Sequence, residues 1–552
     1  MRTLRAAGLV SVLAGSMATA GLLIGAGQPA VEAHPPVLSQ PEGVPMSRGL
    51  TDAERAFLKA NPDYFRSRTS SRAAAPTGPV ECPAEYEPMA AIMMSWESFT
   101  PVLVEMAKHI TTTGNADVYM VVDTASEQTT ATNSLAAGGV NMARVKFFIR
   151  TTDSVWIRDY GPRYIYEGGV RAIVDHTYNR PRPNDDALSP WYGPQVGQQV
   201  YDVGLVHGGG NYHLDGLDGG YCTKLINNEN PTLTQAQIHG KWLTYQGLDT
   251  TFFDPFPTAL DSTQHIDMWM QVYGDRAVMI SDWPVTGGNM TIADTICDGA
   301  AVTMAGKGFT VTRVPARQVS NVHYTYTNVV MCNDLIIIPS YTNSTIVSAG
   351  YNAQALTAWQ NANPTKTVVA VNAQSVVTSA GVFHCIVMHI PANKGGQDPV
   401  AYLRTPNEGG SFNPGDEAPI SWISDDDVSV TGVDLKLSID GGETYPISIA
   451  TNQSADGSYT WTVPDMFTNH ARIRAVARDA GGRTGVDDSD ADFAIAGTCL
   501  ADFDFSGFVD LDDYAAFIAA FEAGAITADV DGTGFVDLDD FTMFVARFEA
   551  GC

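Results

Sequence analysis

The C-terminal end of the chain repeats one pattern of acidic and small residues. Residues 502–513 and 529–540 align position by position, and an aromatic-rich segment expected to be helical follows each copy, at 514–521 and 541–548. Oxygen-bearing side chains at positions 1, 3, 5, 9 and 12, with glycine at position 6, are typical of a calcium-binding loop. A merely solvated acidic tail would have no reason to repeat in register. The sequence therefore predicts a small helical module with two Ca²⁺ loops, whose ligand positions are Asp502, Asp504, Ser506, Phe508, Asp510 and Asp513, then Asp529, Asp531, Thr533, Phe535, Asp537 and Asp540.

A chain of 552 residues is too long for a single hydrophobic core, and its sequence pattern changes after Pro391. Residues 400–496 carry short alternating strands separated by Gly, Asp and Asn turns, a pattern typical of an immunoglobulin-like β-sandwich. We expect it to act as a spacer or packing module, because it shows no chemical motif. The clearest strands are predicted at 419–423, 434–439, 458–463 and 471–478.

The region before Pro391 alternates short apolar strands with turn clusters and brief helices, which indicates a large mixed α/β domain. Its clearest strands are predicted at 116–122, 144–149, 277–280 and 335–338. The expected organisation of the whole chain is therefore a signal peptide at 1–33, a linker or prosegment at 34–80, an α/β domain at 81–395, a β-sandwich at 396–497 and a helical calcium module at 498–552.

The N-terminus has the features of an export signal. Arg2 and Arg5 precede an apolar run from Ala6 to Ala26, and small residues near Ala33 offer a cleavage site. An uncleaved membrane anchor is the alternative, although Gly and Ala make the run weakly hydrophobic. We expect a secreted or cell-surface protein without a transmembrane anchor. The linker that follows contains one predicted helix, at residues 51–60.

Charge and cysteine content narrow the function further. The chain has 32 basic and 61 acidic residues, a net charge of −29, which disfavours nucleic acid as a partner and favours cationic substrates.

Disulfides persist outside the cytosol, so an even number of the seven cysteines is expected to pair. We predict a Cys499–Cys552 bridge and a free Cys385. Two more bridges are expected from the remaining cysteines, in a pairing that the sequence leaves open: Cys82, Cys222, Cys297 and Cys332.

Four stretches of the α/β domain hold more functional groups than packing requires: 156–162, 207–211, 265–271 and 381–391. The last two are predicted to be strands, with His265 and Asp267 on one face of the first and Cys385 near the start of the second. Each stretch alone is weak evidence, since a polar strand face is usually solvated. Together they supply a thiol, an imidazole and two carboxylates.

This set suits nucleophilic attack on a guanidinium carbon. Two carboxylates hold a planar guanidinium by charge-assisted hydrogen bonds, a thiolate attacks the central carbon, and a histidine protonates the departing amine. A metal site is a poorer interpretation, because the histidines and cysteines lack the close spacing of zinc ligands. No cofactor is expected for catalysis.

The order Trp-x-Arg-Asp-Tyr-Gly-Pro, His-Gly-Gly-Gly-Asn, His-x-Asp and His-Cys resembles the bacterial peptidylarginine deiminase/agmatine deiminase family. The resemblance covers roughly residues 82–391 and implies an α/β fold, the five-bladed α/β-propeller of the guanidine-modifying superfamily. It also implies site roles: Cys385 as nucleophile, His265 as general acid and base, Asp159 and Asp267 as guanidinium ligands, and Trp156 along the aliphatic stem of the substrate.

Residues 179–185 resemble the peptidylarginine branch of that family, in which two arginines capture the carboxylate of a C-terminal arginine. Arg180 and Arg182 would have this role here, unless the segment is only a solvated basic turn. Asn328 is a further expected substrate contact. Ala380 departs from the family, which often has glycine at that position. The expected function is a secreted deiminase that converts arginine, C-terminal in a peptide or protein, to citrulline and ammonia. Deimination of agmatine or of free arginine is the alternative, and a non-catalytic extracellular binding protein is a third interpretation.

The C-terminal module resembles a dockerin, because both loops have aspartate rather than glutamate at position 12. The resemblance implies a cohesin-like partner. Ser506 and Thr533 stand where an acidic residue is usual, which predicts weaker calcium affinity.

Overall fold

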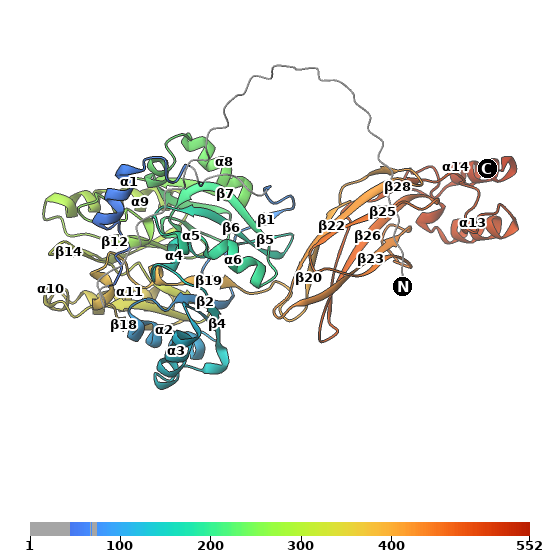
Figure 1. Ribbon diagram of the computed structural model, residues 1–552. Coiled ribbons are helices and arrows are strands. Elements are labelled where there is room, and N and C mark those ends of the chain that lie inside the picture. Colours follow the sequence, from blue (N-terminus) through green and yellow to red (C-terminus); the bar gives the residue numbers. More distant parts are fainter. Residues whose placement is uncertain (1–44, 67, 69–73, 552) are drawn as a thin grey trace, which may run out of the picture. The chain divides into compact units, whose positions relative to one another are not determined.

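The computed structural model describes residues 45–66, 68 and 74–551 (Figure 1). The predicted signal peptide and the first part of the predicted linker lie outside these residues, as does Cys552. Among the helices that the structure describes, none combines the length and the apolar character that a membrane span requires.

One sheet joins the two ends of the α/β domain. Its strand order is β19-β2-β3-β4, in which the last strand of the domain pairs antiparallel with the first long one and the other neighbours are parallel. Helices α2 and α3 make the two crossovers between the parallel strands, as parallel pairing requires. The bounds are β2 Met89–Ser95, α2 Thr100–Thr112, β3 Asp117–Val122, α3 Ala125–Ala137, the 3₁₀ turn η1 Met142–Arg144, β4 Val145–Ile149 and β19 Met388–Pro391.

Four further sheets repeat the same plan, an antiparallel pair extended by a parallel neighbour. Their strands are β1 Val80–Glu81, β5 Arg163–Glu167, β6 Val170–Tyr178 and β7 Val200–His207; β8 His213–Leu214, β9 Gly219–Thr223 and β10 Asp249–Phe253; β11 Met270–Gly274, β12 Ala277–Asp282 and β13 Thr310–Pro315; β16 Val330–Cys332, β17 Leu335–Ser340 and β18 Thr367–Asn372. A separate hairpin pairs β14 Arg317–Val319 with β15 Val322–Tyr324.

Helices again form the crossover connections between the parallel strands (Figure 1). They are α5 Pro183–Asp186, α6 Leu188–Gln195, α7 Leu225–Glu229, α8 Gln235–Gln246, α9 Gly288–Gly306, α10 Ser344–Ser348 and α11 Tyr351–Ala362, and α12 Gln374–Val377 follows β18. The central strands of the sheets are the most buried, whereas outer strands such as β13 and β18 are partly exposed. In β17, for example, Leu335, Ile336, Ile337 and Ile338 have no exposed surface. The strands expected from the sequence at 116–122, 144–149, 277–280 and 335–338 are β3, β4, β12 and β17.

Two of the predicted strands are wrong, and both carry site residues. Residues 266–268 form a 3₁₀ turn, η3 Ile266–Met268, before β11 begins, and Cys385 lies on another, η4 His384–Ile386, before β19. The remaining polar motifs also lie on short turns, α4 Ile157–Tyr160 and η2 Gly209–Asn211. Alternation over so few residues does not distinguish a strand from a tight turn that leads into one.

The expected second and third disulfides are also wrong. Four cysteines outside the site are free and buried: Cys82, Cys222, Cys297 and Cys332. They pack as small apolar residues in three different hydrophobic clusters, and burial raises the pKa of Cys82 and of Cys332 to about 12. Cys499 is disulfide-bonded, and its predicted partner, Cys552, lies outside the described residues.

Residues 400–496 form two β-sheets, which fits the expected immunoglobulin-like domain. The strands are β20 Val400–Thr405, β21 Gly410–Phe412, β22 Glu417–Asp425, β23 Val430–Ser438, β24 Ile447–Gln453, β25 Gly457–Thr462, β26 Phe467–Asp479, β27 Thr484–Asp488 and β28 Phe493–Ala496. The C-terminal region contains α13 Leu511–Ala523, the 3₁₀ turn η5 Ile526–Ala528 and α14 Leu538–Ala550. Phe517 and Phe544 stack between these two helices with ring centroids 3.9 Å apart.

The predicted linker contains a helix that is bound to the α/β domain. Helix α1 Asp52–Ala60 begins at Thr51, whose side chain and that of Glu54 form a reciprocal capping box. Glu54 also accepts a hydrogen bond from Nε of Arg182 at 2.7 Å, and neither side chain is exposed. Burial alone would raise the pKa of Glu54, but Arg182 reverses the effect and the net pKa is lowered.

Removing this charge should detach the helix. Glu54→Gln leaves Arg182 as an unpaired buried cation, a loss that typically costs about 3–5 kcal/mol. We expect limited proteolysis to cut the variant within residues 45–68 while the remainder of the chain stays resistant. Asp52→Asn is the matched control, because Asp52 is a fully exposed member of the surface pair with Arg55 on the same helix. Equal cleavage of both variants would show that the buried pair does not hold α1.

Acid should have the same effect as Glu54→Gln in the unmodified chain. A carboxylate whose folded pKa is lowered contributes fully above its unfolded pKa of about 4.3 and loses that contribution as the pH falls through the folded value.

Candidate active site

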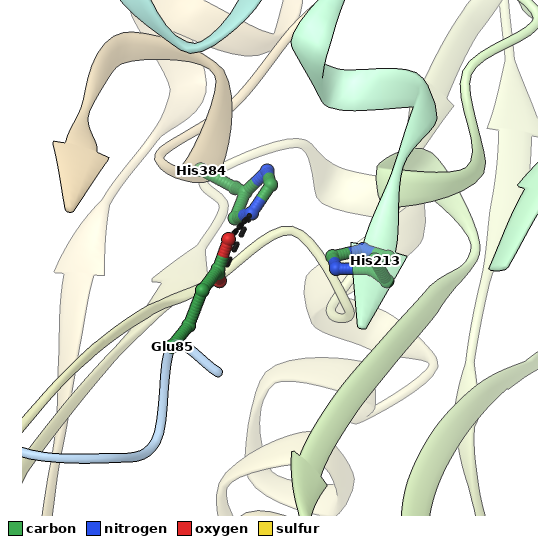
Figure 2. A group of neighbouring side chains, drawn as sticks. All are labelled: Glu85, His213 and His384. Atoms are coloured by element: carbon green, nitrogen blue, oxygen red, sulfur yellow. Dashed lines mark hydrogen bonds and ion pairs between the residues drawn. The ribbon is translucent and has the colours of Figure 1, made fainter. Parts of the chain in front are cut away.

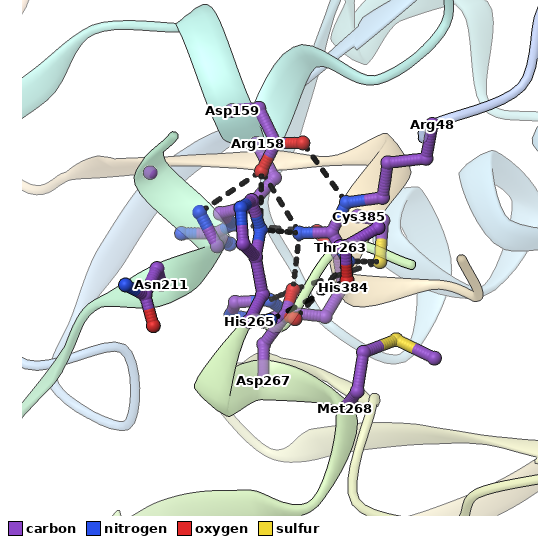
Figure 3. A network of polar contacts seen from close by, with 12 residues as sticks. Arg48, Arg158, Asp159, Asn211, Thr263, His265, Asp267, Met268, His384 and Cys385 are labelled. Atoms are coloured by element: carbon purple, nitrogen blue, oxygen red, sulfur yellow. Dashed lines mark hydrogen bonds and ion pairs between the residues drawn. The ribbon is translucent and has the colours of Figure 1, made fainter. Parts of the chain in front are cut away.

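The polar turns of the α/β domain converge on one buried point. Asp159 comes from α4, His265 and Asp267 from the start and middle of η3, and Cys385 from η4. Figure 3 shows these side chains directed at the guanidinium of Arg48, which enters from the segment before α1. All five side chains are completely buried.

The two predicted carboxylates bind this guanidinium from two sides. Asp159 accepts hydrogen bonds from Nε at 2.9 Å and from Nη2 at 2.8 Å. Asp267 accepts from Nη1 at 3.1 Å and from Nη2 at 2.9 Å. Burial would raise the pKa of both carboxyls, but the Arg48 cation reverses the shift and the net pKa of each is lowered. Two bidentate pairs therefore define a cation site shaped for a planar guanidinium.

The thiol of Cys385 lies against the same group. Its Sγ is 2.7 Å from Nη1 of Arg48, and the side-chain amide of Asn328 donates to it at 3.1 Å. Burial raises the pKa of Cys385 well above its ordinary value, and the guanidinium offsets only part of the rise. A guanidinium at this position therefore favours the thiolate form of Cys385.

His265 lies beside the opposite nitrogen. Its Nδ1 is 2.8 Å from Nη2 of Arg48 and 3.4 Å from Oδ1 of Asp159. Its Nε2 has no hydrogen-bond partner among the described residues. The imidazole is thus placed to exchange a proton with one terminal nitrogen of the guanidinium.

A second row of polar groups holds Asp267 in place. His384 Nδ1 lies 3.0 Å from Oδ2 of Asp267, and its Nε2 lies 2.9 Å from Glu85 (Figure 2). Arg158 donates to the same Glu85 oxygen at 2.8 Å, and the pKa of Glu85, which burial would raise, is lowered by Arg158 and the histidines. These contacts fix the orientation of the carboxylate that the guanidinium needs.

Glu85 and His384, together with His213, also have the residue types of a metal site. The ligand atoms of these three residues lie within 4.8 Å of one another. The charges around them do not suit one. Arg158 already neutralises the charge of Glu85. A divalent cation bound to the same Glu85 oxygen would lie next to the positive charge of Arg158, which would repel it.

Two glycines allow the guanidinium to approach so closely. A Cβ at position 210 would lie 1.9 Å from Nη2 of Arg48, and one at position 381 would lie 2.5 Å from the ring of Trp156 and 3.1 Å from Cδ of Arg48. The main-chain N–H of Gly210 also donates to Asp159 at 3.0 Å. Any side chain at either position would close the site.

The other predicted site residues lie around Arg48 as well. Trp156 packs beside its stem at Gly381 and donates from Nε1 to the carbonyl of Met46 at 2.8 Å. Arg180 and Arg182 do bind the chain near the site, but through its main-chain carbonyls and Glu54. Their predicted role as a clamp for a terminal carboxylate stays a prediction.

Three members of the site were missed in the sequence: Arg48, Glu85 and His384. The adjacency of His384 to Cys385 was a usable signal, since a residue next to the nucleophile can turn toward the same pocket. Arg48 offered none. It lies 111 residues before Asp159 and 337 before Cys385, in a stretch whose composition indicated only a linker.

Sequence comparisons find relatives that are named as deiminases. A protein of Selenomonas ruminantium named as an agmatine deiminase is 25% identical over 364 residues, which cover 56% of this chain and 95% of the relative. The agmatine deiminase of Ectopseudomonas mendocina is 25% identical over 295 residues, which cover 44% of this chain and 76% of the relative.

Solved structures share the fold. The agmatine deiminase of Enterococcus faecalis superposes with a TM-score of 0.50 at 19% identity, covering 58% of this chain and 98% of that one. A Porphyromonas gingivalis protein described as an arginine deiminase has a TM-score of 0.50 at 17% identity, covering 57% and 98%.

The sequence profile of one family matches residues 81–391, more than half of the chain, and this range contains the four motifs and the side chains that surround the Arg48 guanidinium. Through these residues the chain belongs to the Porphyromonas-type peptidyl-arginine deiminase family.

Proposed function

We propose that the chain hydrolyses the guanidinium of arginine held in a polypeptide, giving citrulline and ammonia. Members of the family are hydrolases of the C–N bonds of linear amidines that use a cysteine nucleophile. The observation that carries the substrate assignment is that a peptide-bound arginine, Arg48, fits the site with both carboxylates, the thiol and the imidazole in contact with its guanidinium.

In the first half of the reaction the Cys385 thiolate adds to the guanidinium carbon. Asp159 and Asp267 keep the group planar and charged, which makes that carbon electrophilic. His265 gives a proton to the terminal nitrogen beside it, the C–N bond breaks, and ammonia leaves. A thiouronium group then joins Cys385 to the substrate.

In the second half, water attacks this thiouronium carbon. His265 takes a proton from the water, the C–S bond breaks, and the ureido group of citrulline and the thiolate result. A cavity of about 1040 Å³ lies beside α1, and Thr263 and Gln264, which immediately precede His265, are part of its wall.

The main-chain contacts of Arg48 favour a peptide substrate. Its N–H donates to the carbonyl of Ser379 at 2.9 Å, and its carbonyl accepts from Nε of Arg180 at 3.1 Å. The contact with Arg180 needs a main-chain carbonyl, which an arginine within a chain has and agmatine lacks, whereas the amine of agmatine can still donate to the carbonyl of Ser379. Agmatine is the second candidate, because the relatives with curated names are agmatine deiminases. A non-catalytic binding protein is disfavoured by the complete set of reactive groups.

We also infer that the five sheets with one shared strand plan are the blades of the expected five-bladed α/β-propeller. The pairing of β19 with β2 supports closure of the ring, because the last strand of the domain completes the sheet that its first long strand begins.

For the C-terminal module we propose two Ca²⁺ sites. Carboxylate oxygens of Asp502, Asp504 and Asp513 lie within 4.8 Å of one another, and those of Asp529, Asp531 and Asp540 do so in the second loop. The donor set is all oxygen, as Ca²⁺ prefers. Export from the cell and a cohesin-like partner for this module remain part of the proposal.

The direct test of function is ureido formation from three substrates: a peptide with internal arginine, one with C-terminal arginine, and agmatine. We expect the internal arginine to be converted. If agmatine alone is converted, the second candidate replaces the first. Parallel assays in an Arg48→Gln background remove competition from the guanidinium of the chain itself.

Cys385→Ala should abolish turnover of every substrate, because no covalent intermediate can form, while thermal unfolding changes little. Cys332→Ala is the matched control, since Cys332 is also buried and free. Retained ammonia release by Cys385→Ala would refute the covalent mechanism.

Asp267→Asn removes charge from two hydrogen bonds to the guanidinium. Hydrogen bonds to charged groups contribute about 1.5–3 kcal/mol each, so kcat/KM should fall by at least about tenfold. Asp215→Asn tests the effect of losing a buried carboxylate elsewhere in the domain, where Asp215 binds Tyr221. A kcat/KM equal to that of the parent would remove Asp267 from the site.

Calorimetric titration of the full chain with Ca²⁺ should show two sites, and Asp513→Ala or Asp540→Ala should each remove one. Asp512→Asn should keep both, because Asp512 is the exposed neighbour of Asp513 and no member of the cluster. Calcium removal should leave deimination unchanged, since the two sets of residues do not overlap. No heat on calcium addition would contradict the proposal.

A further inference from the structure

We propose that Arg48 is a substrate of the chain that carries it: the site deiminates Arg48, and the citrulline formed there releases residues 45–66, here called the N-terminal segment, from the site. The inference rests on the proposed function. It adds a modification site, a first turnover that uses no external substrate, and a reason for the site to be closed before that turnover.

The guanidinium of Arg48 is bound as a substrate rather than as a structural cation. A structural arginine needs only its carboxylates, yet Arg48 also contacts Sγ of Cys385 at 2.7 Å and Nδ1 of His265 at 2.8 Å. The thiol and the imidazole touch different terminal nitrogens, Nη1 and Nη2. Nucleophile and proton donor therefore contact the two terminal nitrogens of one guanidinium (Figure 3).

The main chain of the N-terminal segment occupies a built peptide site. Three consecutive carbonyls, those of Met46, Ser47 and Arg48, accept hydrogen bonds from the side chains of Trp156, Arg182 and Arg180 at 2.8, 2.7 and 3.1 Å. The N–H of Arg48 donates to the carbonyl of Ser379 at 2.9 Å. Met46, Arg48 and Gly49 are buried. These contacts bind the polypeptide main chain on both sides of the arginine side chain.

Because Arg48 belongs to the same chain as the site, its guanidinium is favoured as the first to be bound there. Helix α1 follows Arg48 directly and is held to the domain by the buried Glu54–Arg182 pair. An intramolecular ligand competes at an effective concentration in the millimolar range when its linker is short. A free substrate must therefore displace Arg48 for as long as its guanidinium is intact.

The reaction on Arg48 balances without any added reagent but water. The Cys385 thiolate bonds to Cζ, the Cζ–Nη2 bond breaks, and Nη2 leaves as ammonia with a proton from His265. Water then adds to Cζ and the C–S bond breaks. His265 recovers one proton from this water, and the second proton released converts ammonia to ammonium. The net change is the arginine cation plus water to citrulline plus ammonium, with Cys385 and His265 restored.

Citrulline at position 48 weakens the binding that placed it there. The neutral ureido group presents an oxygen where a nitrogen donated to Asp159 and Asp267, so the charge-assisted bonds are lost and an acceptor faces carboxylates. The contacts that remain are neutral hydrogen bonds from Nε and Nη1 to Asp159 and Asp267, the main-chain hydrogen bonds and the Glu54–Arg182 pair. The guanidinium site then opens to other arginines, and one chemical step converts a closed site into an open one.

The decisive measurement is peptide mass spectrometry of the full chain produced in water enriched with heavy oxygen. We expect citrulline at position 48, with the heavy isotope in its ureido oxygen, and unmodified arginine at the exposed positions 55 and 66 of the same segment. Cys385→Ala should retain arginine at position 48. Conversion should not depend on protein concentration, because the reaction is intramolecular.

Each contrary result has a distinct meaning. Arginine at position 48 in a protein that converts a free arginine peptide overturns self-deimination and leaves the proposed function standing. The N-terminal segment is then an unreactive inhibitor. No conversion of Arg48, peptide or agmatine overturns both proposals. Citrulline at position 48 in Cys385→Ala shows modification by another enzyme and also overturns the inference.

A binding experiment tests the closed state separately. Cys385→Ala, which keeps Arg48 intact, should bind the probe N-acetyl-arginine amide at least about tenfold more weakly than the double variant Cys385→Ala/Arg48→Gln. Cys385→Ala/Arg55→Gln should bind like Cys385→Ala, because Arg55 lies on the surface of α1. Equal affinities for the first two proteins would show that Arg48 does not occupy the site in solution, which overturns the proposal.

Discussion

Two buried carboxylates that require a cation between them are the constraint on which the site depends. Asp159 and Asp267 are fully buried and ionised, a state that is costly unless a charge of opposite sign is bound. The guanidinium of Arg48 meets this requirement, and its plane matches two bidentate carboxylates. In the proposed reaction the same pair keeps the guanidinium charged, so recognition and activation of the substrate would come from one arrangement.

The surrounding fold keeps these charges in place by short turns rather than by long elements. Main-chain N–H groups and a chain of side chains, from Glu85 through His384 to Asp267, orient the carboxylates. Glycines at 210 and 381 leave the space that the guanidinium fills. The dependence on a bound cation also explains why an arginine of the N-terminal segment is a suitable occupant. Until another guanidinium arrives, Arg48 removes the cost of two unpaired buried charges.

Much of the fold was accessible from local patterns. The strands β3, β4, β12 and β17 are short apolar runs bounded by turns, the helix after Thr51 has a capping box, and the repeated acidic loops precede α13 and α14 as expected. The errors have a common cause. Residues around 267 and 385 alternate like strands but fold as 3₁₀ turns, because tertiary packing decides the conformation of segments this short. Likewise, the four cysteines for which composition and export predicted bridges are buried and free, distributed over three hydrophobic clusters.

The sequence by itself determined the reactive groups, because thiol, imidazole and carboxylates occur in motifs whose order and residue types identify the chemistry: Cys385, His265, Asp159 and Asp267. Only the tertiary structure decided what lies between them. Arg48 is far from every motif along the chain, and its position in the site follows from the docking of α1 through Glu54 and Arg182 and from hydrogen bonds to its main chain. Contacts at such sequence separations leave no periodicity or spacing to detect, so they exist only in the folded chain.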